Sequence, residues 1–136
     1  MRKTVLRPVL ALAALILLTS GFVLHLRLLK SAPRDGEIVT GIPAEIRLWF
    51  SQKPELGLTT IKLLREDSTV VEQGKVARTD DSLSVRFPLA MALVPGTYIV
   101  SWRSVSKDGH PVRGGYRFTL VPAPPSQTQT GHRFSD

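Results

Sequence analysis

Apolar and polar residues alternate with a period of two in several short stretches of this chain. The clearest stretch covers residues 45–50, where Ile46, Leu48 and Phe50 point to one side and the residues between them to the other. Comparable runs cover residues 82–87, 97–103 and 116–120, with shorter ones at 26–29, 61–63 and 70–71. Successive side chains of a β-strand point to opposite faces, so this period is typical of half-buried strands. The pattern predicts about seven short strands.

Turn-forming residues separate these runs. Clusters of glycine, proline and aspartate lie at residues 33–36, 53–57, 79–81, 95–96 and 114–115. No stretch has the spacing of an amphipathic helix, although the apolar segment 89–94 fits either a helical turn or a packed loop. Many short strands joined by turns favour an all-β fold, an antiparallel two-sheet sandwich of the immunoglobulin-like kind.

The N-terminus has a different pattern. Arg2, Lys3 and Arg7 precede an apolar run at residues 9–18, which the small polar residues 19–21 close. A basic start followed by about ten apolar residues is the pattern of a secretory signal. The apolar stretch from residue 8 to 24 is also only a little shorter than the roughly 20 residues of a membrane helix. We predict export, with residues 1–24 as a signal peptide or an uncleaved membrane anchor.

The C-terminal residues 122–136 contain proline, serine, threonine and glutamine but little that could be buried. This composition predicts a disordered tail. The sandwich domain is therefore expected to cover residues 25–121.

Composition and charge limit the possible functions. The chain has 18 Lys and Arg against 11 Asp and Glu, a net charge of +7, but three of the cations lie in the leader. The others are scattered and form no basic run, so we expect no nucleic-acid partner. Cysteine is absent. Disulfides and thiolate metal sites are therefore excluded, and any metal site must use nitrogen and oxygen ligands.

The candidate chemistry lies in the histidines, of which there are three: His25, His110 and His132. His110 belongs to an Asp-Gly-His sequence at residues 108–110, between two predicted strands. Gly109 permits a tight turn and Pro111 favours an extended His110, which could direct a carboxylate and an imidazole to one point. The spacing alone favours an ordinary loop in which Asp108 caps the turn.

The residues around this turn resemble a known family. Residues 95–114 contain a Gly-x-Tyr-x-Val-x-Trp-Arg strand followed by Ser-x-Asp-Gly-His-Pro, and they closely resemble the C-terminal signature of the CopC family of copper-resistance proteins. Residues 25–33 look like the mature N-terminus of that family, and residues 48–51 look like its Leu-x-Phe-Ser strand. The resemblance covers residues 25–120.

The resemblance implies a periplasmic Greek-key β-sandwich that binds one copper(II) ion through His25, Asp108 and His110. The implied function is copper homeostasis or resistance as a carrier or buffer, not as an enzyme. Copper(II) prefers tetragonal nitrogen and oxygen donors, which agrees with this ligand set. If His25 is the mature N-terminus, its α-amine and its ring can chelate the ion together. Copper is then the expected partner. Any membrane copper permease is expected to be a separate chain, and membrane contact is expected only through an uncleaved leader.

The chain departs from the family pattern at several positions. Gln52 stands where many members carry an acid, and Glu55 is the nearest acid that could replace it. The sequence has only two methionines, which argues against a soft-donor copper(I) site. Two other functions stay open: a metal-free, membrane-tethered immunoglobulin-like interaction module, and a copper-dependent oxygenase. The small size and the carboxylate ligand argue against the oxygenase.

Overall fold

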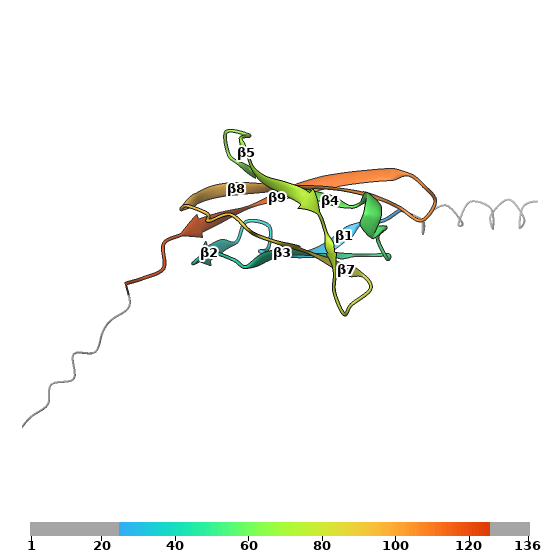
Figure 1. Cartoon of the computed structure of the whole chain (residues 1–136), viewed down its shortest axis with the longest axis horizontal. Coiled ribbons are helices and arrows are strands. Elements are labelled where there is room, and N and C mark those ends of the chain that lie inside the picture. Colours follow the sequence, from blue (N-terminus) through green and yellow to red (C-terminus); the bar gives the residue numbers. More distant parts are fainter. Residues whose placement is uncertain (1–24, 126–136) are drawn as a thin grey trace, which may run out of the picture.

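The computed structural model describes residues 25–125, which form two β-sheets packed face to face (Figure 1). The described strands are β1 (Leu28–Ala32), β2 (Ile38–Thr40), β3 (Glu45–Phe50), β4 (Thr60–Arg65), β5 (Val70–Lys75), β6 (Ala77–Arg78), β7 (Ser84–Pro88), β8 (Gly96–Val105) and β9 (Pro111–Val121), with a 3₁₀ turn η1 (Leu56–Leu58) between β3 and β4. The two layers are visible in Figure 1, where β4, β8 and β9 lie in one and β1, β3 and β7 in the other.

One sheet has the strand order β1-β3-β7-β6 and the other β2-β9-β8-β4-β5. The chain crosses repeatedly between them, as in the Greek-key sandwich that the resemblance implied. The all-β sandwich is thus confirmed. Two details differ from the prediction. The described residues form nine strands instead of about seven, and β2 pairs with β9 in parallel. The additional strands β2 and β6 have three and two residues, which is too short for an alternation to be recognised.

The predicted alternation places the core. Ile46, Leu48 and Phe50 of β3 are fully buried, while the residues between them are partly exposed. The predicted apolar faces of the other long strands are buried as well, at Ile61, Leu63, Tyr98, Val100, Trp102, Tyr116, Phe118 and Leu120. These side chains meet between the sheets because each strand turns its apolar face inward.

Two segments follow the pattern less closely. Leu83 is exposed and Ser84 is buried, because the Asp81 carboxylate accepts a hydrogen bond from the Leu83 N–H (2.9 Å) and holds this residue in a turn. The segment 89–94 is a packed loop, the second of the two structures that its sequence allowed. Its Leu93 is buried, and the Tyr98 hydroxyl donates to the Val94 carbonyl at 2.7 Å.

Several predictions for the two ends of the chain fall outside the described residues. They are the leader at residues 1–24 and the tail from residue 126 onward, including His132. Within residues 25–125, no helix is long and apolar enough to span a membrane.

Gly114 on β9 lies directly opposite Trp102 on β8, where a side chain would meet the buried indole. A Cβ added at Gly114 would lie 2.7 Å from the Trp102 ring, whereas one added at Gly57 meets nothing within 4 Å. We expect Gly114→Ala to lower the free energy of unfolding by about 1–3 kcal/mol through overpacking. Urea unfolding followed by circular dichroism measures this, with Gly57→Ala as the control. Equal midpoints for the two variants would contradict the expected clash.

Candidate metal centre

The hairpin between β8 and β9 positions Asp108 and His110 at one end of the sandwich. Gly109 has φ +86°, a left-handed conformation that glycine adopts without steric cost. Its N–H donates to the Ser106 carbonyl (2.9 Å), and the Ser106 N–H donates to the His110 carbonyl (2.9 Å). These bonds close a tight turn directly beyond the last strand pair, Val105 and Pro111. The aspartate and the histidine therefore project from the end of the two longest strands.

Asp108 and His110 contact each other through their side chains. The Asp108 Oδ2 lies 2.7 Å from the His110 Nδ1, and the His110 backbone N–H donates to Asp108 Oδ1 (3.3 Å). Because Nδ1 faces the carboxylate, the opposite nitrogen of the ring, Nε2, is directed away from it. A carboxylate in this position fixes the orientation of an imidazole, as it does for many metal-binding histidines.

Ser106 forms a hydrogen bond with this pair. Its side chain is almost fully buried, and its hydroxyl donates a short hydrogen bond to Asp108 Oδ1. This bond, followed by the contact with His110, holds the pKa of the Asp108 carboxyl well below its usual range. Asp108 is therefore a carboxylate at neutral and at mildly acidic pH.

His25 reaches the same end from the other sheet. Ser51, directly after β3, accepts a hydrogen bond from the Arg27 N–H on its Oγ (3.0 Å), and its own N–H donates to the Arg27 carbonyl (2.8 Å). The Ser51 hydroxyl also contacts the His25 carbonyl at 3.5 Å, and the next residue, Leu26, is buried in the core. Hydrogen bonds to Ser51 and the burial of Leu26 thus hold the segment from His25 to Arg27 against the end of β3.

The rings of His25 and His110 lie with their centres 6.4 Å apart, tilted by 45°. A metal–imidazole bond of about 2.0 Å places an ion about 3 Å from a ring centre, so two rings on opposite sides of one ion have centres about 6 Å apart. The ring separation therefore fits a shared ion. Within residues 25–125, however, no three His, Cys, Asp or Glu side chains converge closely enough to form a preformed metal cage. Asp108 is turned toward His110, so a common centre requires side-chain rotation.

The other candidates from the sequence contribute less. Glu55 precedes η1, and its carbonyl accepts a hydrogen bond from the Thr59 hydroxyl (2.7 Å), but no described contact joins its carboxylate to either histidine ring. Gln52 follows Ser51 at the end of β3. Ser106 belongs to the Ser-x-Asp-Gly-His-Pro motif, but nothing in that motif indicates that its side chain supports the metal centre. A serine two residues before an aspartate is common, and only its burial and its hydrogen bond indicate that it positions Asp108.

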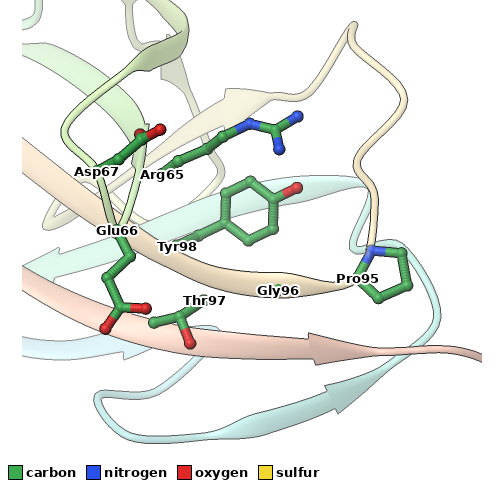
Figure 2. Close-up of a pocket in the computed structure, with 7 residues that line it drawn as sticks. All are labelled: Arg65, Glu66, Asp67, Pro95, Gly96, Thr97 and Tyr98. Carbon is green, nitrogen blue, oxygen red and sulfur yellow. The ribbon is translucent and has the colours of Figure 1, made fainter.

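A hollow of about 460 Å³ lies elsewhere, at the start of β8. Figure 2 shows the residues that line it: Arg65, Glu66, Asp67, Pro95, Gly96, Thr97 and Tyr98. The strand β8 runs from this hollow to the Asp108–His110 turn, and its ten residues span about 30 Å. The Tyr98 hydroxyl that faces this region is already bonded to Val94. The hollow is therefore separate from the histidines.

Comparison with known proteins shows which family the chain resembles. A family model described as the CopC domain matches residues 28–121. Protein YobA of Escherichia coli strain K12 is 34% identical over 116 residues, covering 85% of this chain and 94% of that protein. Copper resistance protein C of Escherichia coli is 33% identical over 99 residues, covering 68% of this chain and 79% of that protein.

The solved structures include a similar fold. The crystal structure of CopC from Methylosinus trichosporium OB3b superposes with a TM-score of 0.68 at 29% identity, covering 74% of this chain and 97% of that one. The sandwich and the sequence signature thus point to the same family. The chain belongs to the CopC family, and its role is a copper-related one.

Proposed function

We propose that this protein is a periplasmic carrier or buffer that binds one copper(II) ion through His25, Asp108 and His110. One observation carries the proposal. In a chain of the CopC family, the fold brings the rings of His25 and His110 within 6.4 Å of each other at the end of the sandwich, with Asp108 against His110.

The donor atoms favour copper(II) over copper(I). Two imidazoles and a carboxylate are nitrogen and oxygen donors, which suit copper(II), the ion at the top of the divalent affinity order. Copper(I) prefers thiolate and thioether ligands. The chain has no cysteine, and Met91, the one methionine within residues 25–125, lies in the 89–94 loop away from the β8–β9 turn. If the mature chain begins at His25, its α-amine adds a second nitrogen donor from the same residue.

The exposure of the centre suits a carrier. The His110 side chain is 70% exposed, and His25 is exposed as well. Enzymes usually enclose a substrate in a concave site that excludes water. An ion held on the exposed rim of the sandwich can pass to another protein without opening the core.

Replacing either proposed histidine ligand should weaken copper(II) binding. We expect His25→Ala and His110→Ala each to lower the affinity by about a hundredfold, since even the loss of an outer-shell partner costs 10–100-fold. Competition titration against a chelator measures the affinity, and electron paramagnetic resonance should show the loss of a tetragonal one-copper signal. His132→Ala is the matched control and should bind like the wild type.

The opposite outcome is equally informative. If the wild-type protein takes up no copper at stoichiometric metal, the proposed carrier function is wrong, and the metal-free interaction module is favoured. Equal weakening by His132→Ala would place the metal elsewhere.

The mature N-terminus tests both the proposed location and the chelate. Expressed with its leader in a Gram-negative host, the protein should be recovered from the periplasm with an intact mass that begins at His25. Acetylating that N-terminus should then weaken copper binding, because it removes the amine donor. A mass that begins at Met1 would contradict both cleavage and the amine ligand.

The Ser106 hydroxyl should influence both the pKa of Asp108 and the copper affinity. The folded state lowers the pKa of Asp108, so the carboxylate stabilises the turn above the unfolded value of about 3.9, and this contribution is lost as pH falls through the lowered pKa. We expect Ser106→Ala to raise this pKa and to weaken copper about tenfold. Carboxyl ¹³C NMR follows the titration of Asp108. Ser101→Ala on β8 is the control, and an unchanged Asp108 titration in Ser106→Ala would refute the positioning role.

A further inference from the structure

The hairpin that carries the proposed metal centre also carries two arginines in direct opposition. Arg103 of β8 and Arg113 of β9 are cross-strand partners, two residue pairs before the hairpin closes at Val105 and Pro111. Both side chains are exposed on the outer face of the five-stranded sheet. Like charges directly opposite each other across two strands are destabilising. The fold therefore accepts an electrostatic cost at this position.

Nothing in the described part of the chain offsets that cost. Among residues 25–125, the ion pairs are Arg86 with Glu45 and His110 with Asp108. Neither Arg103 nor Arg113 forms an ion pair or a side-chain hydrogen bond with any of these residues. The two guanidinium groups thus keep their donors available to an external partner.

A second arginine pair shows how the same fold neutralises such a contact. Arg47 of β3 and Arg86 of β7 are also cross-strand partners. Arg86 pairs with Glu45 at 3.6 Å, and Arg47 donates to the Ser84 hydroxyl at 3.3 Å and stacks over the Trp49 ring at 4.9 Å. Both arginines of this pair thus have partners within the protein, although the Arg47 Nε is buried without a hydrogen bond, whereas neither arginine beside the proposed metal centre has a side-chain partner among the described residues.

The surface between the uncompensated arginines is hollowed. A hollow of about 230 Å³ is lined by Arg103, Pro111, Val112 and Arg113, and Pro111 directly follows the proposed ligand His110. The planar fork of a guanidinium matches a carboxylate with two parallel hydrogen bonds. Both arginines line one hollow, so an oxyanion there would be within the reach of two guanidinium groups.

We propose that Arg103 and Arg113 form a carboxylate clamp that docks an acidic side chain of a partner protein beside the copper centre. This inference rests on the proposed function, because a carrier must bring its ion close to a receiving or donating protein. Complementary charge orients such encounters and speeds them. A protein partner fits better than a lipid surface, since no large apolar side chain within residues 103–113 is exposed for insertion into lipid.

The test uses the ¹⁵N-labelled protein in its exported form, with a hexaglutamate peptide as the probe. We expect amide shifts concentrated at residues 103 and 111–113, and an affinity that falls about tenfold in Arg103→Gln/Arg113→Gln, as expected from the loss of charge-assisted hydrogen bonds. Arg47→Gln/Arg86→Gln removes the same charge from the opposite sheet. This matched control should bind the peptide within twofold of the wild type.

Three results would contradict the clamp. The peptide could bind equally weakly to the two double variants, or the amide shifts could be spread evenly over the basic surface. The protein could also bind phosphatidylglycerol vesicles through Arg103 and Arg113 while it does not bind the peptide. The last result would assign the pair to a lipid surface.

Copper titration of the same samples separates this proposal from the function on which it rests. If the wild type binds no copper, the carrier fails; if copper binds normally in every variant while the peptide does not bind, only the clamp fails.

Discussion

The antiparallel pairing of β8 with β9 is the constraint on which the rest of the structure depends. The two strands stay in register from the Gly96–Leu120 pair to the Val105–Pro111 pair, without a bulge. Their inward side chains supply much of the core, and their outward side chains include the Arg103–Arg113 pair. Because the backbone of so long a hairpin is fully paired, its turn is held at a fixed place at the end of the sandwich. Asp108 and His110 are placed at that end by this pairing.

The proposed centre joins the two sheets at this end. Asp108 and His110 come from the five-stranded sheet, whereas His25 precedes the first strand of the four-stranded one. Sheet packing, not local sequence, sets the distance between the two rings. The burial of Leu26 and the hydrogen bonds of Ser51 hold the N-terminal segment against β3. A metal ion shared by the two histidines would therefore link elements that are 85 residues apart, and its binding would stabilise the folded state by mass action.

The charged groups at this end of the sandwich differ in whether they have partners within the protein. The carboxylate of Asp108 is hydrogen-bonded to Ser106 and His110, which lower its pKa. The guanidinium groups of Arg103 and Arg113, a few residues away, face solvent without an acid from the described chain. In the proposed carrier, the anionic ligand Asp108 is paired within the protein, whereas the cationic surface of Arg103 and Arg113 is left for a partner. The proposed ion site and the proposed partner site would therefore use different residues.

The sequence by itself determined the fold class, the buried faces of the long strands and the family. A period of two is imposed by the strand backbone, and the Asp-Gly-His turn lies within one continuous signature, so both are readable without coordinates. The sequence did not predict β2 and β6, because these short strands form only where neighbouring strands offer backbone hydrogen-bond partners. The tertiary structure also decided that Ser106 is buried under Asp108, that His25 reaches His110, and that one arginine pair is compensated while the other is not. These relations depend on side chains distant in sequence, whose proximity is fixed by the packing of the two sheets.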